Sequence, residues 1–237
     1  MEPATPDRER TGSGGRFLRR SSDLQGLLDT IRSFKKLGPK ASQYWSEPLE
    51  VMIRRWQKVR SPDLKLAIEP YNPEWPVRFE HERRRLAAAL GEAALDIQHI
   101  GSTAIPGLAS KNIIDLFIAL DGPPTAHEAL TALSQRGYES YGNSPIDPET
   151  LWLWRCEAEG PAFVAHLCDH RRSWLTTAVN FRDYLLAHPE EKQRYVDAKI
   201  QAARQKDPGI LKYSLDKLLI WTDIADRANA WVASGRS

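Results

Sequence analysis

Residues 99–120, HIGSTAIPGLASKNIIDLFIAL, decide the fold of this 237-residue chain. The stretch begins as a short strand that ends in a Gly-Ser turn, continues through a loop marked by Pro106 and Gly107, and closes with an apolar strand over 113–120. A single carboxylate, Asp115, interrupts that second strand. A buried aspartate costs free energy unless a cation, a metal ion or a hydrogen-bond donor meets it. Asp115 is therefore the first candidate for a functional residue.

The Gly-Ser turn before this strand is typical of a place where a phosphate can approach the backbone. Glycine has no side chain and tolerates unusual dihedral angles, so backbone N–H groups and the Ser102 hydroxyl can face an anion. An aspartate on the next strand can then hold a divalent cation that bridges to the same phosphate. Nucleotidyl transfer uses this arrangement, and its usual signature has a second aspartate two positions after the first. Phe117 stands at that position here.

The stretch 99–115 resembles the core motif of the GrpB family, H-I/V-G-S-T-x-V/I-P-G-L-x-x-K-P-I-I-D. Further agreement lies outside it. Residues 69–75, EPYNPEW, resemble the opening of the family, and residues 180–190, NFRDYLLAHPE, resemble its F-R-D-Y-L-R-x-H-P-E segment. Two Y-x-x-x-K motifs of the family are matched by Tyr195 with Lys199 and by Tyr213 with Lys217. The resemblance covers roughly residues 67 to 233.

This resemblance implies an α+β fold: a nucleotidyltransferase-like mixed β-sheet with helices packed on one side and helical N- and C-terminal flanks. It implies a nucleotide-binding nucleotidyltransferase that uses a nucleoside triphosphate, Mg²⁺ and an acceptor that the sequence does not identify. Asp115 is the expected catalytic residue and metal ligand. The expected substrate-binding residues are His99, Gly101, Ser102, Thr103, Lys111, Arg182 and Lys217.

Each of these residues also has a structural interpretation that the sequence leaves open. The Gly-Ser pair can simply make a tight turn, and Asp115 can be the buried partner of Arg182, Lys199 or Lys217. Leu186 stands where the family usually has an arginine, and Phe117 stands where the transfer signature has its second aspartate. The site therefore has fewer charged side chains than is expected of an active transferase. The alternative function is therefore a nucleotidyltransferase-fold module without catalysis, which binds a ligand or a protein.

A third hypothesis is an accessory role in coenzyme A synthesis, because GrpB domains also occur fused to a dephospho-coenzyme A kinase. The sequence has no G-x-x-x-x-G-K-S/T phosphate loop, so it does not itself supply that kinase.

Composition limits the choice of partners and compartment. With 33 basic and 31 acidic side chains, no general attraction to nucleic acid or to a membrane surface is expected. The two cysteines, Cys156 and Cys168, lack the paired spacing of a metal site and are expected in the core. No apolar segment predicts a signal peptide or a membrane span, so a cytoplasmic protein is expected.

Three regions are expected along the chain. Residues 1–20 are rich in Pro, Gly, Ser and Arg and are predicted to be disordered. Residues 21–62 carry two amphipathic helical patterns, whose expected roles are padding of the domain or self-association into a homo-oligomer. Residues 63–237 are predicted to form the GrpB-like domain. Its expected strands are 95–100, 113–120, 151–156 and 162–168. The first expected helix of the domain runs to about residue 90. The later expected helices cover about 125–135, 174–187, a segment that starts near 189, and 210–232.

Overall fold

A computed structural model describes residues 67–123, 126–144, 147, 149–158, 160–171, 173–204 and 209–235. The predicted disordered tail, 1–20, and the predicted helical extension, 21–62, lie outside these residues. The homo-oligomer expected through that extension stays a prediction for the same reason.

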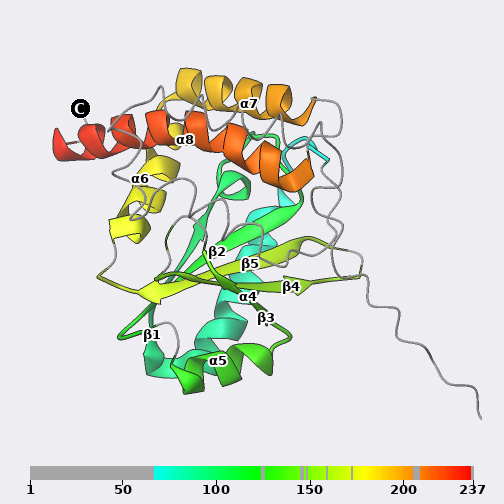
Figure 1. Ribbon diagram of the computed structural model, residues 1–237, viewed down its shortest axis with the longest axis vertical. Coiled ribbons are helices and arrows are strands. Elements are labelled where there is room, and N and C mark those ends of the chain that lie inside the picture. Colours follow the sequence, from blue (N-terminus) through cyan, green and yellow to red (C-terminus); the bar gives the residue numbers. More distant parts are fainter. Residues whose placement is uncertain are drawn as a thin grey trace, which may run out of the picture.

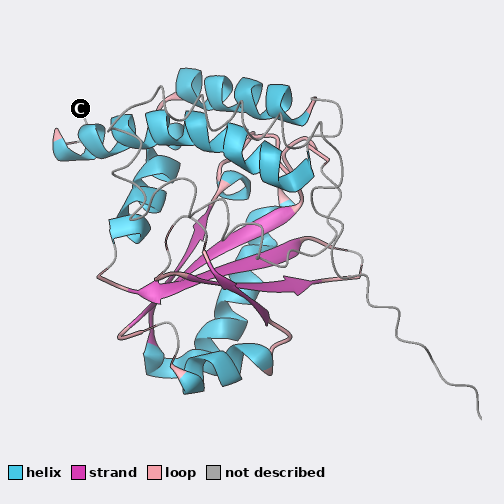
Figure 2. Cartoon of the chain, viewed as in Figure 1, coloured by secondary structure: helices cyan, strands magenta, loops and turns pink. Residues whose placement is uncertain are grey.

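A five-stranded mixed β-sheet forms the centre of the domain (Figures 1 and 2). Its spatial order is β1-β2-β5-β4-β3. The neighbours β2 and β5 run parallel, and the other neighbouring pairs are antiparallel. The strands are β1 (Ala94–Ile100), β2 (Ile113–Leu120), β3 (Glu139–Asn143), β4 (Leu151–Cys156) and β5 (Ala162–Asp169).

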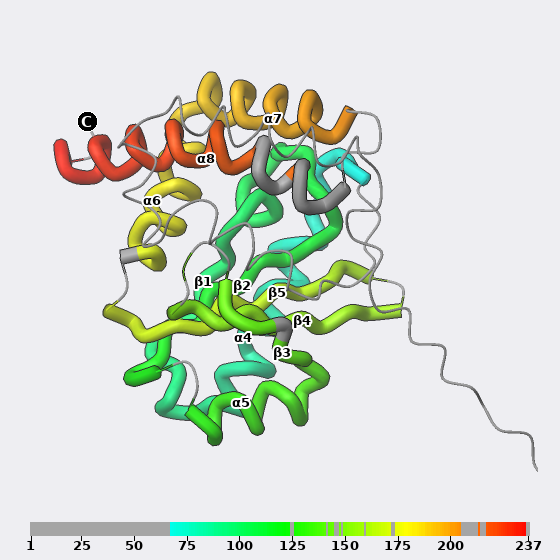
Figure 3. The backbone as a smooth tube through the Cα atoms, in the orientation of Figure 1, coloured from blue at the N-terminus to red at the C-terminus, as the bar shows by residue number. Residues whose placement is uncertain are grey.

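Two groups of helices lie on opposite sides of this sheet (Figures 1 and 3). The helices α4 and α5 pack on one face and build the main apolar core there. They correspond to the expected layer of helices on one side of the sheet. The helices α6, α7 and α8 pack together on the other side. The helices are α4 (Glu74–Leu90), α5 (His127–Ser134), α6 (Ser173–Ala187), α7 (Pro189–Ala203) and α8 (Gly209–Ala233).

The arrangement confirms the predicted α+β class and its mixed sheet. Strand β2 lies between β1 and β5, and most of its side chains are buried, so its apolar sequence reflects cover on both faces. Sequence patterns missed β3, a polar strand at the edge of the sheet. Cys168 is buried as expected, but Cys156 is exposed because it ends β4. In the described part of the chain, no helix has the length and apolar character needed to cross a membrane.

The loop between β1 and β2 is fixed to the C-terminal helices. Its apolar side chains Ile105 and Leu108 have no exposed surface, and they pack in a cluster with residues of α6, α7 and α8 such as Phe181, Tyr195 and Ile224. At the far end of the loop, Ser110 pairs with Glu69 through two backbone hydrogen bonds of 2.8 and 2.9 Å. These contacts hold the loop where side chains of α7 and α8 approach the start of β2.

Candidate functional site

The turn after β1 brings the backbone of Gly101 against the carboxylate of Asp115. Gly101 has φ 71° and ψ −169°, a combination that is essentially restricted to glycine. A Cβ atom at this position would overlap the Asp115 carboxylate and lie 3.0 Å from its Cβ. Ile100, the residue before the turn, is paired with Asp115 across the β1–β2 ladder. Glycine is thus required both for the turn and for the close approach to Asp115.

Asp115 is hydrogen-bonded to a histidine of the neighbouring strand. The Nε2–H of His166 on β5 donates to Oδ1 of Asp115 at 3.2 Å. The Asp115 side chain is 29% exposed. Burial raises the pKa of Asp115, but the hydrogen bond and charge of His166, with the charges of Lys217 and Lys111, outweigh burial and lower that pKa. Asp115 is therefore an ionised carboxylate whose partner is His166 rather than Arg182.

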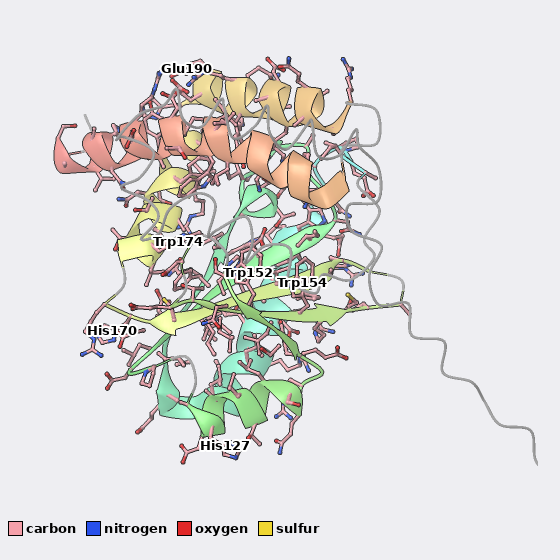
Figure 4. The ribbon with its side chains drawn as sticks, viewed as in Figure 1. His127, Trp152, Trp154, His170, Trp174 and Glu190 are labelled. Atoms are coloured by element: carbon pink, nitrogen blue, oxygen red, sulfur yellow. The ribbon has the colours of Figure 1, made fainter. Side chains whose placement is uncertain are left out.

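An aromatic surface continues from Asp115 across the same face of the sheet. The register pairs Phe117 with His166, and His166 in turn with Trp152, so these three side chains share one face. Trp174 of α6 stacks on both Phe117, at 6.0 Å, and His166, at 5.9 Å, between ring centroids. Figure 4 shows Trp152 on this side of the sheet and Trp174 reaching toward it from α6. Phe117 is fully buried, so it contributes packing at the position where the usual nucleotidyl-transfer signature has its second aspartate.

Lysines from three elements surround Asp115. Lys111 lies just before β2, Lys199 is on α7 and Lys217 is on α8, and all three interact electrostatically with Asp115 or with one another. Burial and the charge of Lys217 lower the pKa of Lys111 to about 7, against the opposing effect of Asp115. Burial, with Lys217 and Lys111, also lowers the pKa of Lys199 well below its ordinary value. The described site is therefore rich in amines and poor in carboxylates.

Two tyrosine rings lie next to these amines. The Nζ of Lys111 lies 5.1 Å from the ring centroid of Tyr213, and the Nζ of Lys199 lies 5.4 Å from that of Tyr195. Burial raises the pKa of Tyr213 to about 12. The pKa of Tyr195 is also raised by burial, although its hydrogen bond with the Ser102 side chain opposes the rise. Ser102 is buried, so its side chain connects the Gly-Ser turn to α7.

Two of the expected substrate-binding residues lie elsewhere. His99 stacks on Phe79 of α4, with 4.5 Å between centroids, on the face of the sheet opposite to Asp115. Its Nε2 donates to Thr103 Oγ1 at 3.0 Å, and the Thr103 hydroxyl donates to the carbonyl of Ile113 at 3.0 Å. Burial lowers the pKa of His99 to about 4, so its ring is neutral near pH 7. The structure therefore places His99 and Thr103 in a hydrogen-bonded chain that holds the turn.

Arg182 of α6 is likewise kept away from Asp115. Its Nη1 donates to Gln98 Oε1 at 3.0 Å and to the carbonyl of His99 at 2.9 Å, and its Nε donates to Asp183 at 2.9 Å. These contacts connect α6 to β1. Asp169 pairs with Arg171 at the end of β5.

The described residues do not assemble the carboxylate set that Mg²⁺ prefers. Mg²⁺ is held by oxygen ligands in a near-octahedral arrangement, and two-metal transfer needs several carboxylates. Among the described residues, Asp115 is not part of any group of three or more His, Cys, Asp or Glu side chains able to hold a metal ion. One oxygen of Asp115 already accepts a hydrogen bond from His166, and three lysine amines, whose protonated forms would repel a cation, lie within electrostatic range of it. These residues alone do not fit the ion.

The lowered pKa of Lys111 predicts a pH dependence of stability. The unfolded chain keeps this lysine protonated up to its ordinary pKa near 10.5, whereas the folded chain releases the proton near pH 7. The unfolded state then binds more protons, so stability rises with pH by about 1.4 kcal/mol per pH unit per proton. We expect a smaller rise between pH 7 and pH 9 for Lys111→Met than for the wild type in urea unfolding of the ligand-free protein. Equal slopes would contradict the lowered pKa of this amine.

Comparisons with known proteins agree on one family. Residues 65–227 match the family model described as GrpB protein. A UPF0157 protein of Halalkalibacterium halodurans is 29% identical over 162 residues, which cover 68% of this chain and 80% of that protein. The crystal structure of the conserved protein GrpB from Enterococcus faecalis aligns with a TM-score of 0.60 and 26% identity, covering 68% of this chain and 96% of the other.

A second kind of relative is longer than this chain. A protein named dephospho-CoA kinase from Mycolicibacterium paratuberculosis is 29% identical over 233 residues, covering 87% of this chain. The present chain spans only 56% of the length of that protein. A match that covers 87% of this chain is longer than residues 65–237, so the likeness extends into the segment before residue 65.

Proposed function

This chain belongs to the GrpB protein family, and from that premise we propose that it is a nucleotide-binding protein. The reaction we propose for it is transfer of a nucleoside monophosphate to an acceptor that is still to be identified, supported by Asp115. The phosphates would lie against the turn at Gly101 and Ser102, beside Lys111 and Lys217.

One observation carries this proposal. The Gly101 backbone adopts a conformation that only glycine tolerates and lies directly against an ionised carboxylate. Glycine adopts this conformation without steric cost and has no side chain, so the backbone at the turn is open to close approach by a ligand. The amines of Lys111 and Lys217 lie within electrostatic range of the same carboxylate, which supports an anionic ligand. A nucleotide supplies that anion.

A second candidate function is a ligand-binding module without catalysis. The observation in its favour is the single carboxylate: Phe117 is buried in an aromatic cluster with Trp174, and Asp115 is held by His166. Among the described residues no set of carboxylates could hold the two metal ions of nucleotidyl transfer. The site can then bind phosphates and still lack the electrostatic means to stabilise transfer. Both candidates predict nucleotide binding, and they differ in turnover.

Binding is tested by a thermal-shift and calorimetric screen against ATP, CTP, GTP and UTP, each with and without Mg²⁺. We expect at least one nucleotide to stabilise the protein, by about 2.7 kcal/mol when its concentration is a hundred times its dissociation constant. The magnesium requirement expected from the sequence stays a prediction that the paired conditions address. A well-folded sample that responds to no nucleotide would contradict the proposal.

Turnover is tested with the bound nucleotide labelled at its α-phosphate and a cell extract as the source of acceptors. Transfer predicts a labelled product together with released pyrophosphate, both lost in Asp115→Asn. Binding without these products supports the non-catalytic module.

We also propose a cytoplasmic location, because neither Cys156 nor Cys168 forms a disulfide bond, as is usual for proteins in a reducing compartment. The likeness to dephospho-CoA kinases covers little more than half of such a protein. We propose no kinase activity for this chain, whose sequence has no P-loop motif.

A further inference from the structure

Three lysine side chains from separate elements converge beside the Gly101 turn. The charge of Lys217 contributes to the lowered pKa of Lys111, and both lysines contribute to the lowered pKa of Lys199. The three amines therefore lie within electrostatic range of one another. Lys111 and Lys217 are partly exposed, whereas Lys199 is 1% exposed. Folding thus brings three amines together in a region with little solvent to screen their charge. Burial and their mutual repulsion lower the pKa of Lys111 and of Lys199, so both amines give up a proton more readily than an exposed lysine does.

The partners that the structure gives these amines do not supply enough negative charge to keep all three protonated. Lys199 donates to the carbonyl of Ala109 at 2.7 Å, and Lys111 faces the ring of Tyr213. The one carboxylate within reach among the described residues is Asp115, which already accepts a hydrogen bond from His166. Buried charges in proteins are ordinarily paired. An excess of amines over carboxylates indicates a place for an anion.

Two buried polar atoms nearby are also without a hydrogen-bond partner among the described residues. They are the hydroxyl of Tyr213, a fully buried residue, and Nδ1 of His166. Tyr213 interacts electrostatically with both Lys217 and Asp115. Buried polar atoms are nearly always hydrogen-bonded in native proteins, so these orphans are a second, independent indication that the site receives a polar ligand.

We propose that Lys111, Lys199 and Lys217 neutralise the phosphate chain of the nucleotide in place of a divalent cation, so that the site binds nucleotide without Mg²⁺. This inference rests on the proposed function and adds how the phosphates are held. Lys111 and Lys217 contact the phosphate oxygens. The buried Lys199 takes up a proton from solvent when the anion binds and so adds positive charge from behind. The Tyr213 hydroxyl donates to the same group. Asp115 then repels the ligand slightly instead of anchoring it through a metal ion.

The test measures binding of the nucleotide found in the screen, and of inorganic tripolyphosphate, in EDTA and in Mg²⁺. We expect the two conditions to give dissociation constants within about threefold of each other. Lys217→Gln should weaken binding about tenfold or more in EDTA, because it removes one charge-assisted hydrogen bond. Asp115→Asn should bind at least as tightly as the wild type in EDTA, because it removes a negative charge next to the phosphates.

Two further variants separate the charge of the site from general effects. Lys217→Arg keeps the charge and should retain most of the affinity. Arg84→Gln removes a charge from α4, where Glu80 remains paired with Arg83 at 2.7 Å, and should leave binding unchanged. A Lys217→Gln protein that binds as well as the wild type, with native circular dichroism, would overturn the inference.

The outcomes also distinguish this inference from the proposed function. Binding that requires Mg²⁺ and is lost in Asp115→Asn would overturn the inference and leave nucleotide binding in place. Absence of binding by every nucleotide and by tripolyphosphate, under both conditions, would overturn both. Tripolyphosphate binding in EDTA that depends on Lys217 would support the lysine cluster as a phosphate site.

Discussion

Glu82→Gln is expected to lower the free energy of unfolding by about 3–5 kcal/mol, the range for removing one partner of a buried ion pair. Glu82 lies on α4 and is 4% exposed. Its Oε2 accepts from Arg155 of β4 at 3.0 Å, and the side chain of Arg155 is only 15% exposed. The neutral variant would leave that guanidinium buried without its main counter-charge. Urea denaturation monitored by tryptophan fluorescence measures the loss.

The size of the effect follows from the number of groups that converge on this carboxylate. Oε1 accepts from Arg85 at 2.6 Å and from the Tyr138 hydroxyl at 2.9 Å. Burial, together with the charge of Glu82, raises the pKa of Tyr138 well above its ordinary value. Glu82 thus joins α4 to β4 and to the segment after α5. An amide in its place can keep one of these contacts but not all of them.

Glu80, one helical turn away from Arg84, supplies the matched control. It pairs with Arg83 at 2.7 Å and Arg84 at 2.9 Å, but its side chain is 35% exposed. Solvent screens such pairs, so Glu80→Gln should change stability far less than Glu82→Gln. Replacing both Glu82 and Arg155 by leucine should recover much of the loss, because no unpaired charge is then buried between them. Equal losses for Glu80→Gln and Glu82→Gln would contradict the buried ion pair.

Glu82 also shows where sequence patterns stop being informative. It lies in the charged run EHERRR, and such a run on a helix normally indicates a solvated face. The apolar strands and the long helices could be predicted because their periodicity is local. The edge strand β3, with the sequence ESYGN, could not, because it is polar and is defined by its pairing with β4.

The approach of Gly101 to Asp115 could be predicted from the sequence, whereas the positions of the side chains around this pair could not. The turn at Gly101 and the carboxylate of Asp115 are close in sequence, so their approach could be inferred from one motif. The hydrogen bond from His166 depends on the parallel pairing of β2 with β5, which no local pattern specifies. Tyr213 and Lys217 are four residues apart, a spacing that puts them on one face of a helix. Their position beside Lys111 depends on how α8 packs.

Gly101→Ala is expected to damage both the fold and the site. Its φ of 71° with ψ of −169° costs a non-glycine residue about 1–3 kcal/mol. The new Cβ would also overlap the Asp115 carboxylate, so either the turn or the strand must move. We expect a loss of about 3 kcal/mol or more in the free energy of unfolding, since an overlap adds to the backbone strain. Nucleotide binding should be lost even at a temperature where the variant remains folded.

Gly91 allows the two causes to be separated. It also has a positive φ, 56°, but a Cβ atom there would have no neighbour within 4 Å. Gly91→Ala should therefore carry only the backbone cost and leave nucleotide binding intact. Combining Gly101→Ala with Asp115→Ala removes the overlapping carboxylate, so the glycine substitution should cost less in that background than in the wild type. Strict additivity of the two changes, measured as free energies of unfolding, would contradict direct contact between Gly101 and Asp115, because only residues that touch are expected to couple strongly.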